Sequence, residues 1–163
     1  MNTQAIGVIH TPFDAAEGTP IQSALAAGAE GRVEVFPAFR DGLKDLEGFD
    51  RLWLLYWFDR ADAARLRVVP YLDDVERGVF ATRAPCRPNP IGLSSVRLLR
   101  VEGNVLQVAD VDMLDGTPLL DIKPYVPRFD CSDAARCGWL EEARTGRTRA
   151  DERFAAKREA DGR

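Results

Sequence analysis

A proline-rich segment with two arginines, RAPCRPNPIG, occupies residues 83–92. Its three prolines and its Asn-Pro pair predict a stiff, non-helical course. A stiff loop loses little conformational entropy on binding, which favours fixed placement of Arg83 and Arg87. Guanidinium groups donate in a planar fork that suits carboxylates and phosphates. The spacing alone leaves two interpretations open, which are an anion-binding loop and a rigid connection between strands with exposed arginines.

A second segment, DMLDGTPLLDIKPY over residues 112–125, gathers charged side chains next to apolar ones. Its Asp-Gly-Thr-Pro stretch has the composition of a turn. Close together around this turn lie Asp112, Asp115, Asp121 and Lys123. Carboxylates at the ends of strands can bind ribose hydroxyls or an ammonium group. The alternative is that the aspartates cap turns and that Lys123 forms an ion pair with Asp121.

The elements that would position these segments are short and separated by turn residues. Apolar residues follow the strand period, and Gly103-Asn104 between two such stretches suits a tight hairpin turn. No regular alternation of strands with long helices is present, which argues against a doubly wound sheet. Strands are expected at residues 5–10, 32–36, 51–58, 79–82, 94–102, 105–111 and 119–122.

This pattern predicts an all-β fold, a barrel or a sandwich, with minor helices. One short helical turn is expected at residues 40–46, and a longer helical stretch at residues 131–157. We therefore divide the chain into a β-barrel domain over residues 1–130 and a helical C-terminal extension over residues 131–163.

The bulk composition argues against several classes of protein. The net charge is −4, but eight arginines between residues 60 and 100 permit an RNA partner, because local patches matter more than the total charge.

No apolar run is long enough to span a membrane and the start of the chain lacks the features of a secretory signal, so we expect a cytoplasmic protein. Three cysteines without CxxC spacing and a single histidine, His10, argue against a disulfide framework and a metal site. Glycine-rich nucleotide-binding and common hydrolase motifs are absent.

Four segments follow one another along about residues 5–127, namely IGVIHTPF, GFDRLWLLYWF, GVFATRAPCRPNPIG and DMLDGTPLLDIKPY. Their order and spacing resemble the TsaA-like family, also called the TrmO family of tRNA methyltransferases. The resemblance implies a single-barrel methyltransferase outside the Rossmann class, which is a homodimer and uses S-adenosyl-L-methionine (SAM). It also implies a tRNA partner, in which the methyl acceptor is N6 of N6-threonylcarbamoyladenosine, the modified adenosine 3′ of the anticodon.

The resemblance further implies which residues bind the cofactor. The enterobacterial type has Pro-Arg-Gln where this chain has Pro-Ile-Gln at residues 20–22, and His-Gln where it has Asp-Arg at residues 59–60. The cofactor-binding residues implied are Pro20, Ile21, Gln22, Asp59, Arg60, Arg83, Leu93, Asp112, Met113, Leu114 and Asp115.

Methyl transfer from a sulfonium is an in-line displacement, so positioning provides most of what the protein contributes. We assign the carboxylate of the cofactor to Arg83, and its ammonium group or ribose to Asp112 or Asp115. The acylated N6 is a poor nucleophile that must lose a proton. Asp115 or Asp121 is a candidate base, and Lys123 is a candidate for stabilising the developing negative charge.

Arg87 and Asn89, on the proline-rich loop, are the candidate substrate-binding residues. Two alternatives to the tRNA enzyme stay open. One is a SAM-dependent methyltransferase that acts on another RNA or on a small molecule. The other is a SAM-binding regulatory module without turnover.

Overall fold

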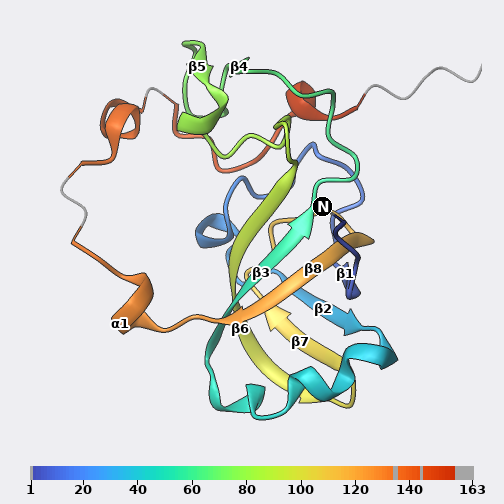
Figure 1. Ribbon diagram of the computed structural model, residues 1–163. Helices are drawn as coiled ribbons and strands as arrows, with labels where there is room; N and C mark the ends of the chain where they lie inside the picture. The colour runs from blue at the N-terminus through green and yellow to red at the C-terminus, as the bar shows by residue number, and fades with distance from the viewer. Residues whose placement is uncertain (1, 134–135, 144, 157–163) are drawn as a thin grey trace, which may run out of the picture.

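A closed barrel of six antiparallel strands forms the centre of the computed structural model, which describes residues 2–133, 136–143 and 145–156 (Figure 1). The strands are β1 (Gly7–His10), β2 (Glu30–Val35), β3 (Arg51–Trp57), β6 (Ile91–Glu102), β7 (Val105–Ala109) and β8 (Thr117–Pro124). Around the barrel they follow the order β1-β2-β7-β6-β3-β8, and β8 pairs with β1 to close it. The predicted all-β barrel is confirmed.

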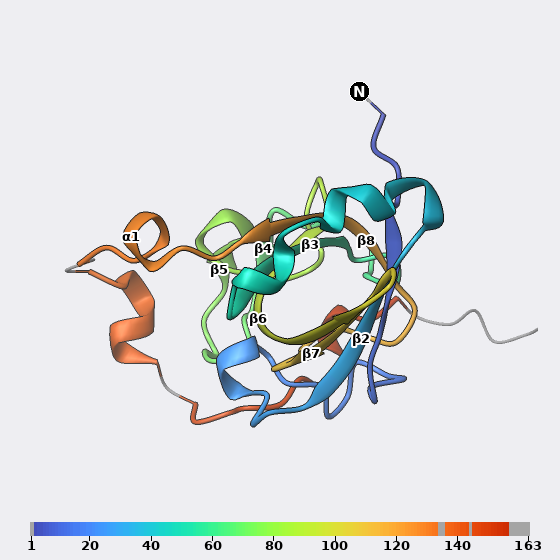
Figure 2. The same ribbon diagram turned by 90° about the horizontal axis from the view of Figure 1, so that it is seen from below.

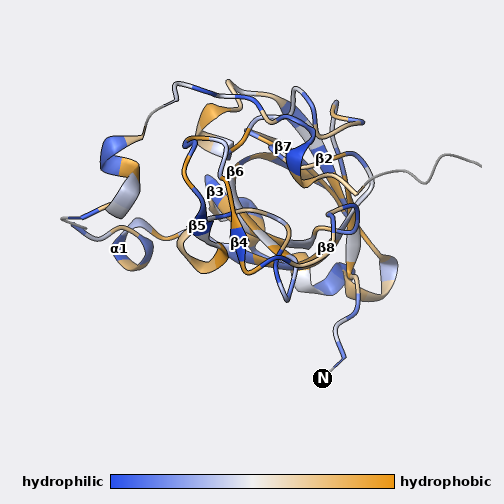
Figure 3. Ribbon diagram, turned by 90° about the horizontal axis from the view of Figure 1, so that it is seen from above, coloured by the Kyte–Doolittle hydropathy of each residue, from blue (hydrophilic) through white to orange (hydrophobic). Residues whose placement is uncertain are grey.

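Alternation along each strand turns one set of side chains into the barrel. In β3, for example, Leu52, Leu54 and Tyr56 are buried, whereas the residues between them lie on the outer wall. Each fully buried aliphatic side chain stabilises the fold by about 1.5–3 kcal/mol. Figure 2 looks into the barrel from below, and Figure 3 shows apolar residues along the strands that surround the core. The core includes Ile9, Val33, Val35, Leu52, Leu54, Val96, Leu106, Val108 and Leu119.

The longest strand, β6, runs from one end of the barrel to the other. It pairs with β3 from Ile91 to Arg97 and with β7 from Arg97 to Glu102. The expected hairpin turn follows, with Gly103 at a φ of 66°, which glycine adopts without steric cost. Ile91 lies opposite Trp57, so the start of β6 and the end of β3 lie together at one end of the barrel, here called the open end.

The chain between β3 and β6 leaves the barrel as a small ribbon of β4 (Arg67–Val68) and β5 (Arg77–Gly78). The carboxylate of Asp73 holds the turn of this ribbon, because it accepts a 2.6 Å hydrogen bond from the Arg77 guanidinium. The sequence did not predict these strands, which are only two residues long each.

The prediction of a strand at residues 79–82 is wrong. Val79–Ala81 forms a 3-10 turn, in which Val79 is buried and Phe80 is exposed. A barrel that pairs every strand on both sides has no free edge for a further short strand. The apolar residues here therefore anchor a loop.

Helical elements elsewhere are short as well. The 3-10 turns near the barrel are Ser23–Leu25, Pro37–Leu43 and Leu46–Gly48, and the α-helix α1 spans Pro127–Asp130. The turn predicted at residues 40–46 overlaps the second of these. No helix in the described residues is both long and apolar enough for a membrane span.

In the described residues of the predicted extension over residues 131–157, helical structure is confined to the 3-10 turns Gly138–Glu142 and Glu152–Phe154. Residues 145–156 otherwise run extended across the open end of the barrel (Figure 1). A continuous helix does not form because the backbone groups of these residues bond to barrel loops instead of to one another. Parts of the extension, residues 134–135, 144 and 157–163, lie outside the described residues.

Candidate functional site

A cavity of about 1160 Å³ lies at the open end of the barrel. Loops from both halves of the chain surround it, and the ends of β3 and β6 form its floor together with the residues that precede β8. The lining residues come from within the stretches 14–22, 56–62, 82–94, 112–117 and 150–156, together with Arg65 and Tyr71.

A hydrogen-bonded chain of polar side chains crosses the floor of the cavity. The Tyr56 hydroxyl lies 3.0 Å from Ser94 Oγ, and Ser94 Oγ donates to Asp112 Oδ1 at 2.5 Å. Tyr56 and Ser94 point inward because they continue the buried alternation of β3 and β6. Polar groups therefore replace the apolar core at the level where the barrel opens.

Asp112, the carboxyl group of this floor, has an unusually high pKa. Burial raises its pKa from the ordinary 3.8 to about 6, although the hydrogen bond from Ser94 and the positive charge of Arg83 oppose the shift. Burial likewise raises the pKa of the Tyr56 phenol, which stays protonated. A carboxyl that ionises near neutral pH inside a cavity is typical of a functional site, and it can pair with a cation or exchange a proton.

All of the predicted cofactor-binding residues except Asp115 line this cavity. Two of them meet across it, since Arg83 Nη1 donates to Gln22 Oε1 at 2.5 Å. Asp115 turns its carboxylate away and accepts a 3.0 Å hydrogen bond from the Thr11 N–H. Its carbonyl oxygen accepts from Arg60 Nη2 at 2.7 Å. Asp115 therefore holds a turn next to the cavity.

The predicted catalytic residues Asp121 and Lys123 lie on β8, outside the cavity. The alternation of the strand turns them to the outer wall, opposite Leu55 and Trp53 of β3. Lys123 Nζ forms an ion pair with Asp121 Oδ2 at 2.7 Å. The ion pair that the sequence left open as an alternative is thus present, and neither side chain reaches the cavity of its own chain.

The structure places the two arginines of the proline-rich loop differently. Arg83 is exposed and lines the cavity. Arg87 also lines it, but Arg87 Nη1 donates to three backbone carbonyls of residues 79–84 at 2.9 to 3.2 Å and so stiffens its own loop. The predicted substrate residue Asn89 is exposed and does not line the cavity.

Sequence reasoning missed Tyr56 and Ser94 of the polar floor and the wall at residues 150–156. A signal for Ser94 existed, because it occupies an inward position of a strand that is otherwise apolar on that side. No signal pointed to residues 150–156, whose place depends on tertiary contacts. Within the described residues, no group of His, Cys, Asp and Glu is arranged to hold a metal ion.

Residues 8–131 match the family model of the tRNA-methyltransferase O N-terminal domain. The chain belongs to the TrmO family. A "Probable S-adenosyl-L-methionine-binding protein" of Pyrococcus abyssi is 57% identical over 137 residues, which are 84% of this chain and 74% of the relative. The tRNA (adenine(37)-N6)-methyltransferase of Mus musculus is 37% identical over 135 residues, which are 78% of this chain and 31% of the relative.

A crystal structure of TrmO resembles the fold with a TM-score of 0.72 and 43% sequence identity. The similarity covers 85% of this chain and 63% of the TrmO chain. The matched TrmO domain ends at residue 131. The cavity wall at residues 150–156 therefore lies outside the residues that match the family model.

Gly92 keeps space for the polar floor of this TrmO barrel. A Cβ at position 92 would lie 2.2 Å from Cε2 of Tyr56, so Gly92→Ala must displace the ring and disturb its hydrogen bond to Ser94. We expect Gly92→Ala to lower the free energy of unfolding by about 1–3 kcal/mol, as overpacking does. Urea denaturation measures this change.

Gly42→Ala is the matched control, because no atom lies within 4 Å of the added methyl group there. Its effect should stay within about 0.5 kcal/mol. Equal losses in the two variants would contradict the role given to Gly92.

Proposed function

We propose that this chain is a SAM-dependent tRNA methyltransferase that methylates N6 of N6-threonylcarbamoyladenosine beside the anticodon. The observation that carries the proposal is the cavity at the open end, in which Asp112, with a pKa of about 6, faces the residues implied in cofactor binding. The names of two relatives support it, since one is a SAM-binding protein and the other a methyltransferase of adenine 37 in tRNA.

The side chains of the cavity fit the charges of SAM. Arg83 offers a guanidinium group to the carboxylate of the cofactor, and Asp112 offers a carboxylate to its ammonium or sulfonium group. Ile21 and Met113 add apolar surface for the adenine. The volume, about 1160 Å³, exceeds that of most small-molecule sites and so leaves room for an acceptor base. SAM supplies an electrophilic methyl group when it is bound, and the chain orients it.

Asp112 takes the electrostatic role in this proposal. A neighbouring cation stabilises the ionised form of a carboxyl, so Asp112 is suited to pair with the positive charge of the cofactor. Asp121 and Lys123 face the outer wall, and they therefore take no part in proton transfer within the cavity of the chain that carries them.

An exposed aromatic ring beside the cavity suits an RNA substrate. The side chain of Phe80 is 76% exposed, and the Arg87 guanidinium lies 6.0 Å from the centre of its ring. Phe80 sits on the same loop as Thr82 and Arg83, which line the cavity. Exposed aromatic rings next to arginines stack with unpaired nucleobases. Phe80 is thus placed to stack on a base next to the methyl acceptor.

We further propose that the active form is a homodimer in the cytoplasm. Ile91 and Leu93 are exposed on the outer face of β6, next to the cavity. A second copy that covered these apolar side chains would remove them from water. The cytoplasm is where we expect this enzyme to meet its tRNA substrate.

The pKa of Asp112 predicts the pH dependence of SAM binding. Burial raises this pKa to about 6, so the free protein holds the proton below pH 6 and a cation favours its loss. SAM affinity should therefore rise about tenfold from pH 5 to pH 7 and level off above, following the ionised fraction. Calorimetric titrations at pH 5, 6 and 7 measure it. Asp112→Asn should remove the dependence, and a flat profile in the wild-type protein would argue against this role.

Mass spectrometry of tRNA nucleosides from cells with and without the gene tests the reaction. We expect the methylated form of threonylcarbamoyladenosine to disappear without the gene. A gene copy with Asp112→Asn should fail to restore it. A copy with Arg100→Ala, which removes an exposed ion pair at the far end of β6, should restore it.

The second candidate function is a SAM-binding module without turnover, which the name of the Pyrococcus abyssi relative favours. Under that function, the purified protein binds SAM while the nucleoside profile stays the same with and without the gene. That pair of results would contradict the tRNA methyltransferase.

A further inference from the structure

Residues 145–156, here called the strap, cross the open end of the barrel outside the matched family domain. On one side the strap pairs with the loop that carries residues 20–22. The Ala150 N–H donates to the Thr19 carbonyl at 2.8 Å, and the Gly18 N–H donates to the Ala150 carbonyl at 3.0 Å. The strap thus holds the loop of residues 20–22, which is implied in cofactor binding, through backbone hydrogen bonds.

The other side of the strap pairs with the loop that carries residues 59–60. The Ala156 N–H donates to the Arg60 carbonyl at 3.1 Å, and the Asp62 N–H donates to the Phe154 carbonyl at 3.0 Å. The strap therefore ties together two cofactor loops that come from distant parts of the chain.

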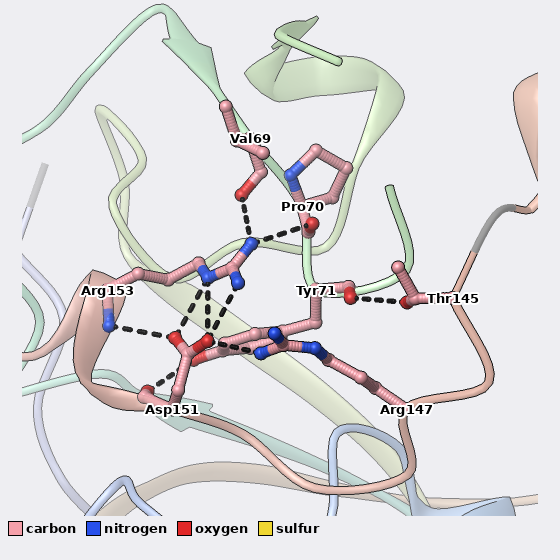
Figure 4. Close-up of polar contacts among 7 residues, drawn as sticks. All are labelled: Val69, Pro70, Tyr71, Thr145, Arg147, Asp151 and Arg153. Carbon is pink, nitrogen blue, oxygen red and sulfur yellow. Dashed lines mark hydrogen bonds and ion pairs between the residues drawn. The ribbon is translucent and has the colours of Figure 1, made fainter. Parts of the chain in front are cut away.

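A cluster of charged side chains anchors the strap to the loop that follows β4 (Figure 4). The Asp151 carboxylate accepts from the guanidinium groups of Arg153 and Arg147 at 2.7 and 2.6 Å. These arginines lower the pKa of Asp151 to about 2, with the hydrogen bond from Arg153 as the main cause. Arg153 also donates to the carbonyls of Val69 and Pro70 at 3.2 and 3.0 Å. Arg153 thus joins the strap to this loop, and Thr145 does so as well, because its hydroxyl donates to the Tyr71 carbonyl at 2.8 Å.

Phe154 adds an apolar anchor next to this cluster. Its ring is buried in a small core with Val68, Ala84 and Cys86, separate from the barrel core. The Tyr71 ring packs edge-on against it at 5.0 Å between centres. Ala84 and Cys86 belong to the proline-rich loop of Arg83, so the strap also contacts the third group of residues implied in cofactor binding.

We propose that the strap positions the loops of the SAM site, with Arg153 and Phe154 as positioning residues. The proposal rests on the function proposed above, because it takes the cavity as the cofactor site. The strap itself lines part of that cavity, at Ala150 and at residues 152–156. Loops held in their binding conformation lose less entropy when the cofactor binds. Loss of the strap anchors should therefore weaken SAM binding without removing any group from the floor.

Arg153→Ala tests this role by calorimetric titration with SAM. We expect the Kd to rise about tenfold, the size expected for loss of hydrogen bonds to a charged group. Arg153→Lys keeps the charge but not the planar fork, so it should restore part of the affinity. Arg100→Ala is the matched control, because it removes an exposed arginine ion pair at the opposite end of β6, and its Kd should equal that of the wild-type protein.

A wild-type Kd in folded Arg153→Ala would overturn the strap proposal alone. A wild-type protein that binds no SAM would overturn the proposed function, and the role of the strap with it. The two failures are therefore distinguishable.

Limited trypsin digestion of the wild-type chain provides a second test that needs no variant. Arg147 and Arg149 are exposed cleavage sites in the strap. If the strap supports the SAM site, the cofactor must in turn stabilise the docked strap. Saturating SAM should slow cleavage after these residues severalfold, and an unchanged rate with SAM bound would overturn the proposal.

Discussion

A closed barrel of six strands has room inside only for side chains, which here are apolar, and this packing confines polar chemistry to its ends. Every barrel strand here pairs on both sides, and the inward positions carry aliphatic residues such as Leu54 and Val96. Only at the open end do the inward positions become polar, at Tyr56 and Ser94. Gly92 makes this change sterically feasible, because its missing side chain leaves room for the Tyr56 ring.

The buried acid next to this floor gives the cavity its electrostatic character. A pKa of about 6 for Asp112 against an ordinary 3.8 corresponds to a cost on the order of 3 kcal/mol for ionising the free site. A cation offsets this cost because it stabilises the carboxylate. The cavity therefore favours a positively charged ligand over a neutral one of the same shape, and SAM carries its positive charge at the reacting sulfonium.

Local patterns in the sequence predicted those parts of the fold that local rules determine. Alternation identified the barrel strands, and Gly103 identified the hairpin between β6 and β7. The order of the family segments identified part of the cavity lining, although spacing alone left the role of these residues open. Asp121 and Lys123 are close to Asp112 in the sequence, but they do not lie in the cavity with it. They belong to a strand, which turns neighbouring positions to different faces.

Contacts between distant residues account for what could not be predicted. Val79–Ala81 is apolar like a strand but has no edge to join, so it forms a 3-10 turn. The sequence of the strap, residues 145–156, predicts a helix. Its conformation depends instead on loops more than 80 residues earlier in the chain, as the hydrogen bonds of Arg153 to Val69 and Pro70 show.

The central claim is that the open end of the barrel holds the cofactor, and a crystal structure of the chain with S-adenosylhomocysteine tests it most directly. We predict electron density for the ligand in the cavity, with its ammonium group or sulfur beside Asp112 and its carboxylate beside Arg83. Ligand density elsewhere on the chain, for example in the shallow depression lined by His10, Arg32 and Gln107, with the cavity free of ligand, would contradict the account.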